Sequence, residues 1–100
     1  MPNKRYAAGR RFEYKRKGEL EAEEWTVIRA SGSHGPFDLV AIKEYAPVQL
    51  IQCKVVQSWS GAKRELKAFP PLPRSAPGAY EQVLDIWVKD LRKMVTKRVS

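Results

Sequence analysis

The sequence predicts a single α/β domain, and three observations lead to that prediction. The chain has 100 residues, of which 43% are apolar, so it suits one domain with one modest core. Residues 5–24 carry small and apolar side chains at helical spacing. Three runs rich in β-branched and aromatic residues follow at residues 25–30, 37–42 and 48–56, a pattern typical of strands. We therefore expect residues 1–100 to fold as one unit, with a helix ahead of the strands.

The predicted first helix has one broad face that includes an acidic residue. The members of this face are small, apolar or acidic, namely Ala8, Gly9, Phe12, Glu13 and Leu20. Arg and Lys surround the face, and the acidic stretch at residues 19–24 is expected to be solvated. Glu13 differs from that stretch because it shares its face with apolar neighbours.

The second and third strands can form a hairpin across a short loop at residues 43–47. Side chains alternate between the two faces of a strand, so Gln52 and Lys54 share one face. If the loop is symmetric about Tyr45, Asp38 lies opposite Gln52, and Lys54 follows one step along the same face. A slip of one residue would separate these side chains.

The rest of the chain predicts one short helix, one loop and a tail of ambiguous pattern. Residues 58–68 fit a short helix. Residues 69–78 contain four prolines and cannot form regular structure. In residues 80–99 the apolar spacing fits a helical stripe, yet residues 83–88 are rich in β-formers. Periodicity alone leaves both a helix and a pair of strands open.

A strong excess of basic residues points to a polyanionic partner. The formal net charge is +8 and the pI is about 9.9. Basic residues crowd residues 4–17 and 89–98, which is typical of nucleic-acid binding, with a solubilising or membrane-surface patch as the alternative. No run is apolar enough to span a membrane, and no secretory signal precedes the helix. The one cysteine, Cys53, alternates with Gln52 and is expected in the core, and its lack of a partner fits a cytoplasmic location.

Polar residues inside apolar strand-like runs form the candidate catalytic constellation. Asp38, Gln52 and Lys54 interrupt such runs, and buried strand faces rarely tolerate charge unless it is paired or bound to a metal. Oxygen ligands from Asp38, Gln52 and Glu13 could hold Mg²⁺, while Lys54 could orient or deprotonate a water. Taken singly, each residue has a plainer explanation as a surface glutamate, a turn cap or part of an exposed strand. Their joint spacing instead predicts a metal-dependent enzyme that hydrolyses a polyanion.

Three motifs follow one another along residues 9–54. They are Gly9-x-x-x-Glu13, then Arg29-Ala30-Ser31-Gly32-Ser33-x-Gly35-x-x-Asp38-Leu39-Val40-Ala41, then Leu50-Ile51-Gln52-Cys53-Lys54. With these three motifs in this order, the chain resembles the archaeal-type Holliday junction resolvases of the PD-(D/E)xK nuclease superfamily. It also resembles the small viral and phage proteins that are similar to those resolvases. The resemblance covers residues 9–56 well and the tail loosely. It implies a restriction-endonuclease-like α/β core with a mixed central β-sheet flanked by helices, and a β-rich tail.

The resemblance also implies an activity and a role for each site residue. The activity would be cleavage of four-way (Holliday) junctions by a two-fold homodimer with Mg²⁺, for which Mn²⁺ can substitute. Two acids, a lysine and a serine would lie in or beside the active site, namely Glu13, Asp38, Lys54 and Ser33. Three arginines would bind the DNA backbone or order the site, namely Arg10, Arg11 and Arg29.

One departure from the family pattern is Gln52, which stands where the family usually has Glu. An amide oxygen can coordinate a metal, but it brings no charge and cannot act as a base. Some restriction-type members of the superfamily that resemble methylated-DNA endonucleases carry Gln-x-Lys at this place. We therefore expect activity with weaker metal binding, in which Lys54 or a phosphate oxygen activates the water. The open alternatives are a nicking or restriction-type nuclease, a DNA-binding module without catalysis, and a structural partner of a larger nuclease.

Overall fold

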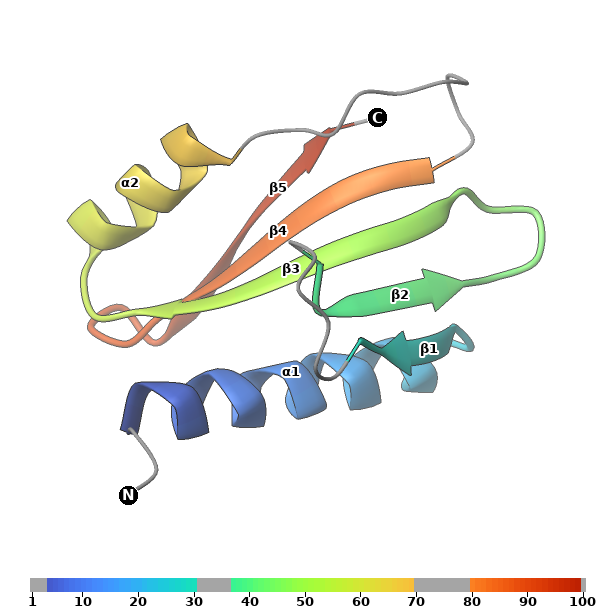
Figure 1. Ribbon diagram of the computed structural model, residues 1–100, viewed down its shortest axis with the longest axis horizontal. Helices are drawn as coiled ribbons and strands as arrows, with labels where there is room; N and C mark the ends of the chain where they lie inside the picture. Colours follow the sequence, from blue (N-terminus) through green and yellow to red (C-terminus); the bar gives the residue numbers. More distant parts are fainter. Residues whose placement is uncertain (1–3, 31–36, 70–79, 100) are drawn as a thin grey trace.

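The computed structural model describes residues 4–30, 37–69 and 80–99, with side chains from residue 7 onward, and these form one five-stranded sheet with two helices (Figure 1). The elements follow the chain in the order α1 (Lys4–Ala22), β1 (Thr26–Arg29), β2 (Leu39–Ile42), β3 (Val48–Val56), α2 (Trp59–Ala68), β4 (Tyr80–Val88) and β5 (Lys93–Val99). The predicted α/β class and the mixed sheet are confirmed. No helix in the described ranges is long and apolar enough to cross a membrane.

The predicted elements match the observed ones, and the ambiguous tail is a pair of strands. β4 and β5 are antiparallel, so the β-rich character of residues 83–88 overrides the helical spacing of the tail. The chain leaves α1 at Glu24, whose φ of 73° lies in the left-handed region, while the Trp25 N–H donates to the Leu20 carbonyl. The predicted turn at residues 31–36 and nearly all of the proline-rich loop lie outside the described residues.

The sheet has the order β1-β2-β3-β4-β5, and one strand pair in it is parallel. β3 and β4 run parallel along their whole length, and the crossover between them carries α2. The other neighbouring strands are antiparallel. The two helices lie on opposite sides of the sheet (Figure 1).

Each face of the sheet has its own apolar core. On the α1 face, Phe12 and Leu20 pack with Ile51 and Cys53 of β3. Cys53 is therefore a core residue, as its position in the strand predicted, and burial raises the pKa of its thiol. On the α2 face, Ala62 packs against the buried side chains of β4.

The apolar side chains of the tail complete the core of the molecule. Leu84, Ile86 and Val88 are at most 1% exposed, and Trp87 is partly buried against the core of the α1 face. Leu84, Ile86 and Val88 are therefore covered within a single chain and are not available for an interface between two copies. β4 is the most buried strand of the sheet, because it lies between β3 and β5 and packs against α2 on one face.

A buried ion pair fastens α1 to β4. The Asp85 side chain is fully buried, and its carboxylate accepts hydrogen bonds from the Arg16 guanidinium at 3.0 Å and the Thr96 hydroxyl at 2.7 Å. Arg16 also reaches Glu19 at 3.0 Å. Both carboxylate oxygens of Asp85 are thus paired, which is what a buried carboxylate requires.

We expect Asp85→Asn to destabilise the fold strongly, because it removes the buried counter-charge of Arg16 and leaves only the more exposed Glu19 to pair with it. The loss should be about 3–5 kcal/mol in urea denaturation. Lys17→Gln is the matched control, because it breaks the more exposed pair with Glu21 on the same helix and should cost about 0.2–1 kcal/mol. Equal effects of the two variants would show that the Asp85 pair does not fasten α1 to the sheet.

Candidate active site

β2 separates from β3 early, and this separation creates the candidate site. The two strands pair only from Leu39 opposite Ile51 to Ala41 opposite Gln49. This is the register that a loop symmetric about Tyr45 predicts. Beyond Ile51, no described strand pairs with β3 on its β2 side, although β3 continues to Val56. The second half of β3 therefore has an open edge.

The backbone turns at Asp38, where β2 begins. The Asp38 carbonyl accepts a hydrogen bond from Ala30 at 2.8 Å, on the β1 side, while its N–H donates to Ile51 at 2.8 Å, on the β3 side. In a regular antiparallel strand both groups of one residue face the same neighbour. The regular pairing that would have set Asp38 opposite Gln52 is therefore not formed.

The Asp38 carboxylate lies against the open edge of β3. One of its oxygens accepts a hydrogen bond from the Cys53 backbone N–H at 2.8 Å. Such a bond places the carboxylate near the plane of the sheet, beside the segment that carries Gln52 and Lys54. The other oxygen has no hydrogen bond to any described residue, so it can accept a further ligand.

Glu13 and Arg29 form an ion pair on the α1 face, close to Asp38. The Arg29 Nε donates to the Glu13 carboxylate at 3.1 Å, and both side chains are less than one-fifth exposed. The Arg29 guanidinium also lies over the Tyr14 ring, 4.7 Å from its centroid. Arg29 is thus held at the site by Glu13 and Tyr14, which agrees with an ordering role.

Two causes raise the pKa of Glu13. Burial disfavours its charged form most, and repulsion by the Asp38 carboxylate adds to this effect. Arg29 and, more weakly, Arg10 lower the pKa, but they do not cancel the rise. Glu13 and Asp38 therefore repel each other, and a cation bound between them would reduce that repulsion.

Gln52 and Lys54 lie on the other side of the β3 backbone. Ile51, Cys53 and Val55 face α1, so strand alternation turns Gln52 and Lys54 towards the α2 face. No hydrogen bond or ion pair joins either of them to Glu13 or Asp38 among the described residues. Glu13 and the pair Gln52 and Lys54 therefore lie on opposite faces of the sheet, and the Asp38 carboxylate lies at the edge of β3 between those faces.

The donor set suits a hard divalent cation only if Gln52 contributes. Within the described ranges, no three His, Cys, Asp or Glu side chains are close enough to form a metal site. Asp38 offers one unbonded carboxylate oxygen, Glu13 is already paired with Arg29, and Gln52 can add a neutral amide oxygen. Carboxylate and amide oxygens are ligands that Mg²⁺ accepts, with water completing its shell.

Of the three remaining predicted site residues, the structure describes two. Arg10 is exposed and near enough to Glu13 to affect its pKa. Arg11 is also exposed and lines a separate pocket. Ser33 lies outside the described residues.

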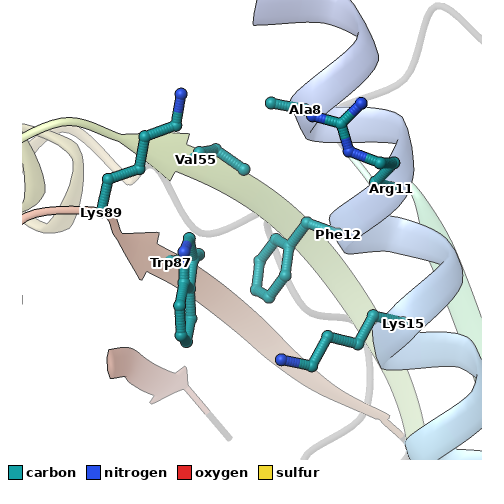
Figure 2. A pocket seen from close by; sticks show the side chains of 7 residues that line it. All are labelled: Ala8, Arg11, Phe12, Lys15, Val55, Trp87 and Lys89. Carbon is teal, nitrogen blue, oxygen red and sulfur yellow. The ribbon is translucent and has the colours of Figure 1, made fainter. Parts of the chain in front are cut away.

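Sequence reasoning missed that pocket, which lies between α1 and the ends of β3 and β4. Figure 2 shows Phe12 and Trp87 within it and three basic side chains around them. The full lining is Ala8, Arg11, Phe12, Lys15, Val55, Trp87 and Lys89. The sequence holds only a weak signal for this pocket, because its lining residues come from three separate elements.

Comparisons with protein families and with curated proteins found no match. The sequence matches no protein-family model, and no curated protein is significantly similar to it. Functional inference therefore depends on the residues of the site and on the motifs described above.

We expect Asp38→Asn to lower the pKa of Glu13, because the variant removes the carboxylate that repels it. In the wild type this pKa lies above 4.5, so Glu13 contributes stability below that pH and loses it as the pH rises through the folded-state pKa. A carbon-detected NMR titration of the Glu13 carboxyl measures both values. Asp90→Asn, remote in an exposed turn, is the control. An unchanged Glu13 pKa in Asp38→Asn would show that the two carboxylates do not interact electrostatically.

Proposed function

We propose that the protein is a metal-dependent DNA endonuclease whose catalytic centre is the open edge of β3 at Asp38. The observation that carries the proposal is the Asp38–Cys53 hydrogen bond of 2.8 Å. This bond sets a carboxylate beside the Gln52-Cys53-Lys54 segment and near Glu13. Asp38 lies at that edge, and the Gln52 and Lys54 side chains, which point towards the α2 face, would reach the cation around the edge, in a strongly basic protein suited to bind a polyanion.

Asp38 and Gln52, assisted by Glu13, would hold the divalent cation. When bound, Mg²⁺ would neutralise charge on the scissile phosphate and make a bound water more acidic. Lys54 would then orient that water or offset the charge that develops on the phosphate. Arg29 keeps Glu13 in place and limits the excess negative charge, which would otherwise repel DNA.

The order of the elements supports the finer fold assignment. A helix, three antiparallel strands, a crossover helix and a parallel fourth strand follow one another, with candidate residues on α1, β2 and β3. This order is compatible with the restriction-endonuclease-like core that the motif resemblance implies. We propose that core for this chain, with junction resolution as its activity.

A two-fold homodimer is part of the proposal, because a four-way junction needs two symmetric cuts and one chain of this size offers one site. Since the tail is buried, the interface must use other surfaces. Ile28 and Ile42 are 55% and 43% exposed. By strand alternation they lie on the sheet face opposite α1.

One observation favours a second candidate, a DNA-binding module without catalysis. Glu13 is already paired with Arg29, and Gln52 carries no charge, so Asp38 is the one ionised candidate ligand without a counter-ion in the described part of the chain. Such a protein would bind branched DNA without cutting it. Cleavage assays distinguish the two functions directly.

We expect the wild-type protein to cut a four-way junction in the presence of Mg²⁺, and to cut it faster than a duplex of the same sequence. Asp38→Asn should abolish cleavage while binding stays equal or becomes tighter, because a charge that repels phosphate is lost. Lys54→Met should slow cleavage by about 10²–10³-fold, the cost of removing one preorganised electrostatic group. Gel assays of cleavage and binding measure both effects.

The matched controls are Asp90→Asn and Lys63→Met, which make the same chemical changes at exposed positions away from the site. Both should cleave at the wild-type rate. Wild-type cleavage by folded Asp38→Asn would refute the assignment of this site. Tight junction binding without any cleavage by the wild type would establish the second candidate, and equal cleavage of duplex and junction would indicate a nicking or restriction-type enzyme.

We expect Gln52→Glu to lower the Mg²⁺ concentration needed for half-maximal cleavage, because it adds a negative ligand beside Asp38. Gln52→Ala should raise that concentration. Titration of Mg²⁺ at fixed DNA measures both shifts, and Ala68→Glu, at the exposed end of α2, controls for added charge. The same Mg²⁺ dependence in all four proteins would place Gln52 outside the metal site.

A further inference from the structure

The pocket beside α1 combines an aromatic base with a basic rim. It has a volume of about 270 Å³ and is built by α1, β3 and β4. Phe12 is buried and Trp87 is partly buried, with their ring centroids 6.5 Å apart and tilted by 42°. Phe12 thus supports Trp87 from one side, while part of the indole stays open to the pocket (Figure 2).

The lining of this pocket carries only one sign of charge. Three of its seven lining residues are basic, namely Arg11, Lys15 and Lys89, and none is acidic. A second, more polar groove continues from it across the start of α2 and shares Ala8, Val55 and Lys89 with it. That groove adds Arg64, together with a single acid, Glu65. The two hollows together form a basic path that begins at the aromatic pocket.

The indole ring of Trp87 already holds a cation. The Lys15 ammonium lies 4.8 Å from the centroid of the ring. Its long side chain can move aside at little cost, so a flat aromatic group could take its place on the ring, leaving Lys15 to pair with a phosphate. Bases stack on aromatic side chains in this way in proteins that bind single strands, with basic residues along the backbone path.

We propose that this pocket takes an unpaired nucleotide of single-stranded DNA, with its base stacked on Trp87 and its phosphates held by Arg11, Lys15 and Lys89. A base in a duplex cannot enter, because both of its faces are covered by neighbouring base pairs. This inference deepens the proposed function and rests on it for the identity of the polymer as DNA. The occupied site would lie close to the catalytic centre.

The distance between the two sites follows from β3 itself. Cys53, which binds Asp38, and Val55, which lines the pocket, lie two residues apart on the same face, or about 7 Å along the strand. Phe12 and Glu13 are also neighbours on α1. A strand with an unpaired nucleotide in the pocket would therefore present a nearby phosphate to the open edge of β3. Branched DNA can supply such unpaired nucleotides, and an uninterrupted duplex cannot.

The test measures binding without cleavage, in the presence of EDTA. A short oligothymidylate is compared with an abasic oligomer of equal length and charge, which has a backbone but no bases. In the Trp25→Phe/Trp59→Phe protein, Trp87 is the single tryptophan. The oligothymidylate should quench Trp87 fluorescence and bind about tenfold tighter than the abasic oligomer, because stacking is worth about that much per base.

A pocket-filling variant tests the same point in a chain that keeps all three tryptophans. Ala8→Leu should obstruct the pocket without changing charge, and should bring the affinity for labelled oligothymidylate down to that for the abasic oligomer, measured by anisotropy. Ala22→Leu is the control, at an exposed position of the same helix outside the pocket. Lys89→Gln should weaken binding of both oligomers, whereas the exposed Lys63→Gln should weaken neither.

The outcomes separate this inference from the proposed function. Equal affinity for the two oligomers, with no quenching of Trp87 and no effect of Ala8→Leu, would overturn the nucleotide pocket even if the wild type cuts DNA. Base-dependent binding by a wild type that never cuts DNA would support the pocket and refute the nuclease. Quenching that persists in Asp38→Asn would show that the pocket works independently of the catalytic centre.

Discussion

The structure depends on a mismatch in length between neighbouring strands. β3 is nine residues long and pairs with β4 along all of them, whereas β2 has four residues and pairs with only three of β3. An edge left open in this way exposes backbone N–H groups that need acceptors. The Asp38 carboxylate supplies one for Cys53. The residue just before β2 thus also supplies an acceptor in the gap that the short strand leaves.

The Asp38 carboxylate at this open edge lies close enough to Glu13 to affect its pKa. Burial raises the pKa of Glu13 on α1, and repulsion by Asp38 at the open edge raises it further. Arg29 offsets part of this repulsion through its 3.1 Å contact with Glu13. The buried Asp85 is different, because Arg16 and Thr96 pair with both of its oxygens. Of these two aspartates, Asp85 is therefore structural, whereas one oxygen of Asp38 has no hydrogen bond to a described residue.

Strand alternation made much of the fold predictable from sequence. The period of two residues predicts the burial of Cys53, and together with a loop symmetric about Tyr45 it predicts the register of the β2–β3 hairpin. The end of pairing at Asp38 was not predictable, because it depends on a backbone turn that no residue pattern specifies. Asp85 was overlooked although it also interrupts an apolar run, since its partner Arg16 is 69 positions away in sequence.

We propose that Asp38 anchors a divalent cation at the open edge of β3. Paramagnetic broadening of backbone amides by Mn²⁺ tests it most directly, because the broadening falls off steeply with distance and requires neither DNA nor turnover. The account predicts that trace Mn²⁺ broadens Asp38 and Cys53 first, and that Asp38→Asn removes this effect. Broadening confined to the exposed acidic stretch at residues 19–24, with Cys53 unaffected, would contradict it.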